Sequence, residues 1–267
     1  MITSLSNPLV KQARALRQKK ARLESGLFLV EGIHHIGEAF EAGWVMDSIL
    51  YAPDLLTSNF ARDLISRLGT KPQAVSVQVI ESLAEKDNPQ GILAIVHQKQ
   101  TRLTELTRSA APGAQKIKCA AALVSPQDPG NVGTILRTLD AVGADALFLL
   151  EGGVELYHPT VIRSSMGTIF WKPIIQASFD EFVTWARQGS YQLLGTSAHG
   201  DVDYQTLVPK SPWILVLGNE QKGLSTLQTN ACDVAISLPM RGRVSSLNLA
   251  VAAGVLLYQY YTGDGQG

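Results

Sequence analysis

The chain has 267 residues, of which 45% are hydrophobic and 17% charged, and its formal net charge is +0. This composition is typical of a folded globular protein and excludes a disordered or fibrous chain. The longest apolar run lies within residues 247–258 and is too short to span a bilayer, and residues 1–12 lack the apolar core of a signal peptide. We therefore expect a cytoplasmic protein without a membrane anchor.

The first distinct feature is a basic segment at residues 11–22, which contains no acidic residue. Apolar residues at Leu9, Ala13, Leu16 and Leu23 form an approximate stripe, so the pattern predicts one basic amphipathic helix. Such a helix is either a solvated surface or a binding surface for a polyanion such as RNA. The basic residues are Lys11, Arg14, Arg17, Lys19, Lys20 and Arg22.

Strand and helix patterns alternate over the first hundred residues and predict a small α/β domain. The predicted strands are residues 26–32, 45–52, 74–80 and 91–98, and the predicted helices are 34–43 and 54–69. A polar stretch follows at 101–116, with Pro112 and Gly113 near its end, and is typical of an interdomain linker. We expect one domain over residues 1–110, a linker that continues to about 117, and a second domain over 118–267.

The second domain opens with a strand–helix–strand pattern. A strand at 119–124 precedes apolar residues at helical spacing that end at Gly143, and a strand at 146–150 follows. This unit predicts a parallel sheet with a right-handed crossover. The alternation continues with helices at 160–170 and 179–189, strands at 172–177, 191–197, 213–218 and 234–239, and a final helix after Asn248.

Loops that follow these strands carry glycines and hydrogen-bonding side chains. Ligands of open parallel sheets bind beyond the carboxyl ends of the strands, which here are residues 125–131, 195–200, 217–223 and 238–243. Taken singly, Asn131 could be only a helix cap, Arg137 a surface residue and Glu220 a loop carboxylate. Likewise, Ser245 and Ser246 could cap the last helix, and Asn248 could be a surface residue of that helix. The shared position of the three loops after strands of one sheet favours a ligand site. A dinucleotide fingerprint and a phosphate-binding Gly-Lys-Ser/Thr sequence are both missing from these turns.

Cysteine and histidine residues show no pattern that indicates a metal. The two cysteines, Cys119 and Cys232, lie in apolar surroundings and predict reduced core residues. The five histidines have no spacing typical of zinc ligands, so we expect no metal site.

Three segments, 131–137 (NVGTILR), 217–223 (LGNEQKG) and 238–258 (LPMRGRVSSLNLAVAAGVLLY), resemble the motifs of the SpoU (TrmH) group of SPOUT RNA 2′-O-ribose methyltransferases. Residues 162–170 also resemble a segment of this family, and the likeness covers roughly residues 119–260. The N-terminal domain is similar to the family's substrate-binding extension at 6–11, 28–32 and 88–95.

The resemblance implies S-adenosylmethionine as methyl donor, RNA as partner and an α/β domain with a deep trefoil knot, a rare exception to unknotted topology. The last helix would pass through the loop before it and take part in a homodimer interface. Its small residues Ala250, Ala252, Ala253 and Gly254 are compatible with close helix contact. The extension favours ribosomal RNA over tRNA as substrate.

The family pattern also implies residue roles. The functional polar set is Arg137, Asn131, Glu220, Ser246 and Asn248. The donor would be held by Thr196, Ser197, Ala198, Leu217, Gly218, Asn219, Ile236, Leu238, Met240, Ser246 and Leu247. RNA would be bound by the six basic residues of 11–22 and by Arg163, with Arg241 and Arg243 as further candidates.

The family assigns removal of the ribose proton to Arg137, although a guanidinium stays protonated at ordinary pH. A neighbouring RNA phosphate could take the proton while Arg137 orients it, or the site could lower the pKa of the arginine; we favour the phosphate. Three hypotheses remain: a ribosomal RNA 2′-O-methyltransferase, a tRNA ribose or base methyltransferase of the same superfamily, and a non-catalytic RNA-binding protein.

Overall fold

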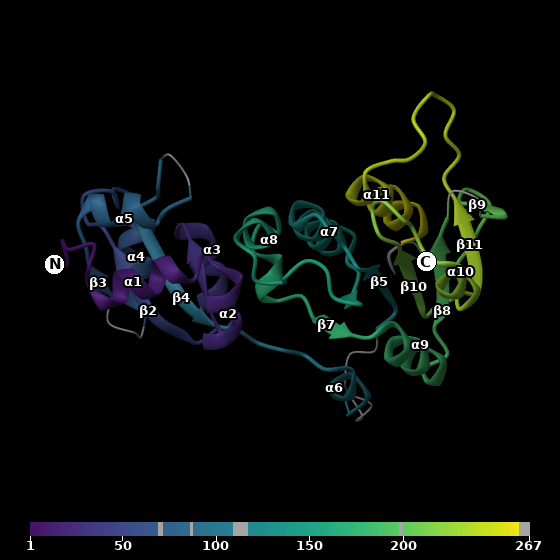
Figure 1. Cartoon of the computed structure of the whole chain (residues 1–267), viewed down its shortest axis with the longest axis horizontal. Helices are drawn as coiled ribbons and strands as arrows, with labels where there is room; N and C mark the ends of the chain where they lie inside the picture. Colours follow the sequence, from purple (N-terminus) through teal and green to yellow (C-terminus); the bar gives the residue numbers. More distant parts are fainter. Residues whose placement is uncertain (69–71, 86–87, 109–116, 198–199, 262–267) are drawn as a thin grey trace. The chain divides into compact units, whose positions relative to one another are not determined.

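The computed structural model describes residues 1–68, 72–85, 88–108, 117–197 and 200–261 (Figure 1). Their contacts form two compact units, each described separately below. Unit 1 consists of Met1–Lys99 and Tyr157–Trp171, and unit 2 consists of Gln100–Leu156 and the chain from Lys172 onward. A segment from the middle of the sequence therefore packs with the N-terminal residues. The predicted boundary, with domains over residues 1–110 and 118–267, refers to domains that fold on their own. The contacts do not test it, so it stays a prediction.

Unit 1 has a mixed sheet in the order β1-β4-β2-β3 among its described residues. The central strand β4 (Ile92–His97) pairs antiparallel with β1 (Leu27–Glu31) and with β2 (Met46–Tyr51), and β2 pairs parallel with the short β3 (Gln73–Ala74). The helices are α1 (Pro8–Ala15), α2 (Lys19–Ser25), α3 (Ile33–Glu41), α4 (Asn59–Arg67), α5 (Val77–Leu83) and α8 (Pro159–Ser164), with a 3-10 turn η1 (Thr168–Phe170).

One predicted strand of unit 1 is wrong. Residues 74–80 were expected to be a strand because valine and isoleucine recur there, but most of this segment lies in helix α5. The Ser76 hydroxyl caps this helix by accepting a hydrogen bond from the Val79 amide at 3.4 Å. Val79, Ile80 and Leu83 then fall on one buried helix face, so burial and capping outweigh the β propensity of the residues.

The basic segment forms two helices instead of the single predicted helix. Helix α1 ends at Ala15 and α2 begins at Lys19. Arg22 is 1% exposed, and its guanidinium donates to the carbonyl oxygens of Leu16 at 2.7 Å and Arg17 at 2.9 Å. These bonds satisfy carbonyl groups at the end of α1 and fix the turn between the two helices. Leu23, expected in the apolar stripe, is 62% exposed.

An aromatic cluster joins the segment 157–171 to the rest of unit 1. The Phe28 ring lies 4.4 Å from that of Tyr157, and the Trp44 ring lies 5.4 Å from that of Phe170. The Trp44 indole N–H donates to the Phe170 carbonyl oxygen at 2.7 Å. The rings contribute apolar packing and the indole N–H adds a hydrogen bond, so this segment is an integral part of the unit 1 core.

Unit 2 contains a parallel sheet in the order β7-β6-β5-β10-β8-β11-β9 among its described residues. The strands are β5 (Cys119–Val124), β6 (Ala146–Leu150), β7 (Ile174–Ala177), β8 (Gln192–Thr196), β9 (Val202–Asp203), β10 (Trp213–Leu217) and β11 (Val234–Ser237). The α/β fold class is confirmed. Strand β9 and helix α10 (Thr226–Asn230) were not predicted, and neither was helix α6 (Leu103–Arg108), which lies within the stretch predicted to be a linker and packs on the unit 2 core.

Helices cover both faces of this sheet (Figure 1). Helix α9 (Phe179–Gln188) packs Phe179, Phe182 and Ala186 onto one face, where α6 (Leu103–Arg108) also contributes. Helices α7 (Pro129–Val142) and α11 (Leu249–Tyr260) pack on each other, with α11 against β10 and α7 against β6. The central strands are buried on both faces, which explains why they are continuous apolar runs in the sequence.

In the part of the chain that the structure describes, no helix is both long enough and apolar enough to cross a membrane.

Candidate active site

The polar loops named from the sequence meet at one edge of the unit 2 sheet. Strands β5, β10, β8 and β11 are neighbours and run parallel, so their carboxyl ends open at the same edge. The register places Val216 of β10 opposite Gly195 of β8, and Thr196 of β8 opposite Ile236 of β11. Residues far apart in the sequence are thereby brought to one site.

Glu220 connects two of these loops. One oxygen of its carboxylate accepts from the Gln127 amide at 2.9 Å, and the other accepts from the Asp128 amide at 3.1 Å and from the Asn131 side-chain amide at 3.2 Å. A carboxylate that accepts three N–H groups is held firmly. The loop after β10 therefore fixes the loop before α7.

Asn131 extends this network to the last helix. Its side chain is 7% exposed, and its amide oxygen accepts from the Asn248 side-chain amide at 2.9 Å. The Asn248 oxygen in turn accepts from the Ala250 amide at 2.9 Å and the Val251 amide at 3.3 Å, which makes Asn248 the N-cap of α11. Glu220, Asn131 and Asn248 thus form one hydrogen-bonded chain, which we call the polar triad.

Asn219 was expected to hold the methyl donor, and its side chain forms hydrogen bonds that fix the loop after β10. Its amide group donates to the Ser125 carbonyl oxygen at 2.8 Å, while its oxygen accepts from the amides of Gln221 and Lys222 at 3.0 and 3.1 Å. At the neighbouring Gly218, a Cβ atom would lie 2.2 Å from the carbonyl carbon of Gly223. Only glycine allows this close approach of the two backbone segments, so the turn requires glycine at position 218.

The other residues expected to hold the donor lie at or after the ends of β8, β10 and β11. Leu217 and Ile236 are buried, whereas Thr196, Ser197, Leu238 and Met240 are half-buried. The Ser197 amide donates to the Ile236 carbonyl oxygen at 2.9 Å, which joins two of these loops. Leu247 is 40% exposed. Ala198 lies outside the described residues.

Arg137 and Ser246 are exposed and do not belong to the polar triad. Arg137 follows Asn131 by six residues in α7, which places the two side chains about 120° apart around the helix axis. Ser246 lies in the segment between β11 and α11, which projects from the rest of unit 2 (Figure 1). The site therefore consists of the hydrogen-bonded triad, in which Asn131 is buried, Glu220 half-buried and Asn248 exposed, and of the exposed Arg137 and Ser246 outside it.

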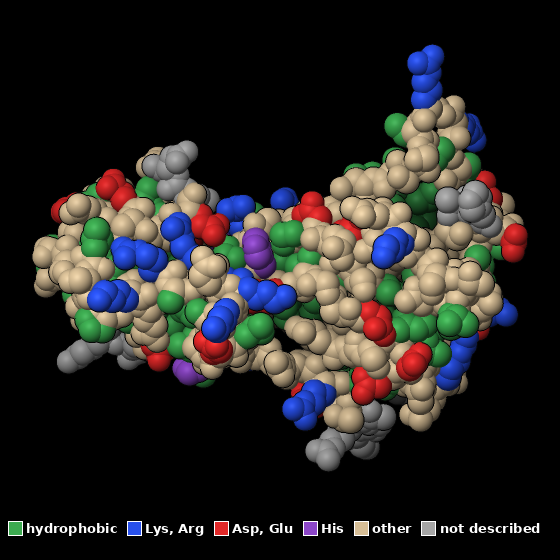
Figure 2. All heavy atoms as spheres, in the orientation of Figure 1, with side chains coloured by type: hydrophobic (Ala, Val, Ile, Leu, Met, Phe, Trp, Pro, Cys, Tyr) green, Lys and Arg blue, Asp and Glu red, His purple; other side chains and the backbone are tan. Residues whose placement is uncertain are grey.

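Lys and Arg side chains are exposed over α1 and α2 (Figure 2). Lys11, Lys19 and Lys20 are exposed, whereas Arg14 and Arg17 are half-buried and donate to the Ser82 hydroxyl at 3.3 Å and the Ala84 carbonyl oxygen at 2.6 Å. The buried Arg22 is not available to a phosphate, so we remove it from the expected RNA-binding set. Arg163 is exposed and forms an ion pair with Glu85 at 3.3 Å.

Sequence reasoning missed the backbone contribution to this site. The amides of Gln127 and Asp128 are the groups that orient Glu220, and the Ser125 carbonyl positions Asn219. Ser125 has a φ of 46°, in the left-handed region that non-glycine residues seldom adopt. The adjacent prolines and Gly130 were the available signal of an unusual turn, but they do not reveal which amides point toward Glu220.

Neither cysteine has the chemistry of a nucleophile. Burial raises the pKa of the Cys119 thiol to about 12, and burial also raises that of Cys232 to about 12, so both are protonated at neutral pH. Among the described residues, no group of three or more His, Cys, Asp or Glu side chains is arranged to hold a metal ion.

The fold is a parallel α/β sheet with a polar site at the carboxyl ends of its strands, and comparison with known proteins gives the family. Residues 118–258 match the SpoU rRNA Methylase family, and residues 7–94 match the MRM3-like substrate binding domain. The chain therefore belongs to the SpoU rRNA Methylase family, as the sequence motifs predicted, and its N-terminal part is a substrate-binding domain of the MRM3-like type.

Similar proteins are known over nearly the whole length of the chain. A 23S rRNA (uridine(2479)-2'-O)-methyltransferase of Streptomyces viridochromogenes is 32% identical over 97% of this chain and 90% of its own length. A 23S rRNA (guanosine(2553)-2'-O)-methyltransferase of Bacillus subtilis is 29% identical over 96% of this chain and 97% of its own. The crystal structure of an AdoMet-bound rRNA methyltransferase from Sinorhizobium meliloti has a TM-score of 0.85 at 34% identity, covering 97% of this chain and 95% of that one.

Proposed function

We propose that this protein transfers a methyl group from S-adenosylmethionine to a ribose 2′-hydroxyl of ribosomal RNA. The observation that carries the proposal is the polar triad, which links the three family motifs through hydrogen bonds at one edge of the sheet. Relatives that match nearly the full chain are 2′-O-methyltransferases of 23S rRNA. With that substrate, we also propose that the protein acts in the cytoplasm.

The strand ends fit a donor of this size and chemistry. Strands β10, β8 and β11 are adjacent, so their ends span about 10 Å, which suits an elongated ligand that lies across the three loops. Main-chain groups near Thr196, Leu217 and Ile236 could bind an adenosine, and half-buried Leu238 and Met240 supply apolar contact. Ser197, Gly218, Asn219, Ser246 and Leu247 complete the proposed donor site, together with Ala198.

Bound S-adenosylmethionine supplies a methyl carbon on a sulfonium, which an oxygen nucleophile attacks in line. In the proposed step, the bond from the ribose 2′-oxygen to the methyl carbon forms as the sulfur–carbon bond breaks, and the sulfonium becomes a neutral thioether. A non-bridging phosphate oxygen of the RNA takes the hydroxyl proton. Arg137 binds this phosphate and the ribose, while Asn131 and Glu220 hold the surrounding loops in place, so the protein contributes chiefly positioning.

Helix α11 presents an exposed apolar face. Val251, Val255 and Tyr258 are 51%, 38% and 65% exposed, and their spacing places them along one face of α11. We propose that a second copy of this chain covers this apolar face. Because α11 packs on α7, a second copy on α11 would lie near α7, the helix that carries Arg137.

We also propose that the path from β11 to α11 forms the trefoil knot of this superfamily. Strand β11 lies beyond β8 near the sheet edge, yet α11 returns to pack on β10 and α7. The intervening segment, residues 238–248, therefore connects a strand on one side of β8 to a helix that packs on the other side of it. A crossing at the carboxyl edge would place this segment beside the proposed donor.

The RNA is proposed to bind the substrate-binding domain over residues 1–110, with the methyltransferase domain over 118–267. The exposed Lys11, Lys19 and Lys20 provide charge for phosphate contacts, and the partly engaged Arg14 and Arg17 extend that surface. Arg163 adds a further guanidinium, and it lies in the segment that packs with the N-terminal residues.

The test incubates purified protein with isotopically labelled S-adenosylmethionine and 23S rRNA, either naked or in ribosomal particles, followed by digestion to nucleosides and mass spectrometry. We expect a labelled 2′-O-methyl nucleoside at one position. Calorimetry should detect donor binding in the presence of a chelator. A labelled base would identify a base methyltransferase, and absence of both donor binding and transfer would contradict the proposal.

A further inference from the structure

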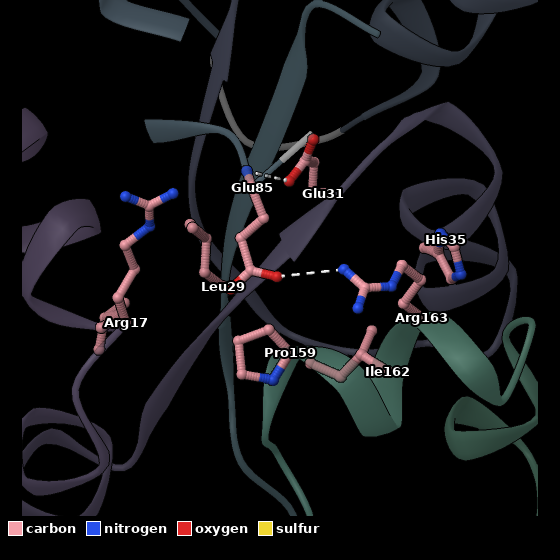
Figure 3. A pocket seen from close by; sticks show the side chains of 9 residues that line it. Arg17, Leu29, Glu31, His35, Glu85, Pro159, Ile162 and Arg163 are labelled. Atoms are coloured by element: carbon pink, nitrogen blue, oxygen red, sulfur yellow. Dashed lines mark hydrogen bonds and ion pairs between the residues drawn. The ribbon is translucent and has the colours of Figure 1, made fainter. Parts of the chain in front are cut away.

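Unit 1 contains a small cavity that the proposed chemistry does not use (Figure 3). Its volume is about 40 Å³, which is room for roughly three water molecules or for the edge of a planar group. All of its lining residues belong to unit 1. Leu16, Leu29, Pro159 and Ile162 supply apolar walls, and Arg17, Glu31, His35, Glu85 and Arg163 supply polar groups.

Two of the polar lining residues of the cavity are carboxylates, Glu31 and Glu85. One oxygen of Glu31 accepts from the Glu85 amide at 3.0 Å, whereas its Oε1 is buried and has no hydrogen-bond partner among the described residues. The Glu85 carboxylate accepts from Arg163 through its Oε2 at 3.3 Å. A buried carboxylate oxygen without a donor is costly, so Glu31 is suited to receive an N–H group from a ligand.

Two guanidinium groups flank these carboxylates. Figure 3 shows Arg17 and Arg163 on opposite sides of Glu85. Arg17 is held by its bond to the Ala84 carbonyl oxygen, and Arg163 by its bond to Glu85. A guanidinium plane can stack on a nucleobase and also pair with phosphate, so the rim is suited to a nucleotide.

We infer that this cavity receives the edge of an unstacked RNA base that carries an amino group, with Glu31 as the residue that accepts from it. The inference rests on the proposed RNA substrate. Adenine, cytosine and guanine present an amino group on their pairing edge, which can donate to Glu31 and Glu85. Uracil presents one N–H between two carbonyl oxygens, and these oxygens would face the two carboxylates. The cavity is thus a base-selecting site separate from the polar triad.

The test measures binding of the full-length protein to four fluorescent RNA octamers at fixed salt. One is octa-uridine, and the others carry a single central adenosine, cytidine or guanosine. We expect at least one substituted octamer to bind about 10-fold more tightly than octa-uridine, the effect of one hydrogen bond to a charged group. In Glu31→Gln, whose amide can also donate to a uracil oxygen, this preference should fall to within about twofold.

Glu24→Gln is the matched control, because it makes the same charge change on the exposed surface of α2, outside the cavity, and should keep the preference. Glu85→Gln provides a second variant if Glu31→Gln fails to fold, and it should also reduce the preference. Equal affinity of the wild type for all four octamers, or equal weakening of all four in Glu31→Gln, would overturn the inference. Neither result depends on the methyl donor, so a failure here is distinct from a failure of methyl transfer.

Discussion

At the residue scale, the role of Glu220 follows from the three hydrogen bonds that its carboxylate accepts. Its carboxylate orients two backbone amides and Asn131, and a glutamine amide would place an N–H against one of those donors. We expect Glu220→Gln to lower the rate of methyl transfer by about 10- to 100-fold, the value of one charge-assisted hydrogen bond. Steady-state assays with labelled donor measure this rate. Glu24→Gln, a surface change of equal charge, should leave the rate unaltered.

Asn248 has two functions that substitution can separate. Its oxygen caps α11, and its amide group donates to Asn131. Asn248→Asp keeps the cap, since aspartate caps helices about as well as asparagine, but it loses the donor. We expect it to keep the helix cap, to melt below the wild type because the buried Asn131 oxygen loses its donor, and to lose most methyl transfer. Asn248→Ala should lose both and destabilise the fold by about 1 kcal/mol. Equal activity in Asn248→Asp and wild type would contradict this role for the amide.

Arg137 is exposed and lies outside the hydrogen bonds of the triad, and its proposed role is to bind the phosphate and ribose of the RNA. Arg137→Ala should abolish methyl transfer while donor affinity measured by calorimetry stays nearly unchanged. Arg137→Lys should also fail, because one ammonium does not replace a planar fork of donors. If donor affinity fell in parallel with activity, Arg137 would belong to the donor site instead.

At the element scale, burial reorganises the basic segment. From the sequence, all six basic residues were equivalent, but the structure leaves Lys11, Lys19 and Lys20 exposed and buries Arg22. We expect the triple substitution of these lysines by alanine to reduce the slope of log affinity against log salt by at most about 2 to 3 units. Filter binding at several salt concentrations gives the slope. An unchanged slope would show that these helices are only a solvated surface.

Arg22→Ala should behave differently from the lysine variants. It removes the bonds to the Leu16 and Arg17 carbonyl oxygens and leaves space inside unit 1. We expect a loss of stability of about 2–4 kcal/mol, seen as a lower denaturant midpoint. A loss of RNA affinity at unchanged stability would contradict the structural role.

The elements that were predicted well are those in which local and tertiary preferences agree. The central strands of unit 2 are apolar runs because both faces are covered, and α7 ends at Gly143 in the left-handed conformation that the sequence indicated. Helix α5 was misassigned because its valines favour a strand until Ser76 and the buried face are considered together. At the site, the motifs identified the triad residues, but the backbone amides that hold Glu220 depend on the tertiary fold.

At the scale of the whole molecule, the proposed homodimer makes a separate prediction. Val255→Glu places a charge on the exposed apolar face of α11 and should yield a monomer with greatly reduced methyl transfer. Sedimentation or light scattering measures the mass, and circular dichroism checks the fold. Leu227→Glu, an equally polar change at an exposed site on α10, should leave the mass unchanged. A wild-type protein that is monomeric at micromolar concentration would refute the interface.

The segment Tyr157–Trp171 also determines how parts of this enzyme could be recombined. Since this segment packs its aromatic residues with Phe28 and Trp44, unit 1 is not one contiguous stretch of the sequence. A chimera that takes only residues 1–110 from a relative would pack the relative's residues against this protein's own Tyr157–Trp171 segment. Exchange of both stretches together would preserve the native packing. To transfer RNA specificity from one relative to another, both stretches of unit 1 must therefore be exchanged together.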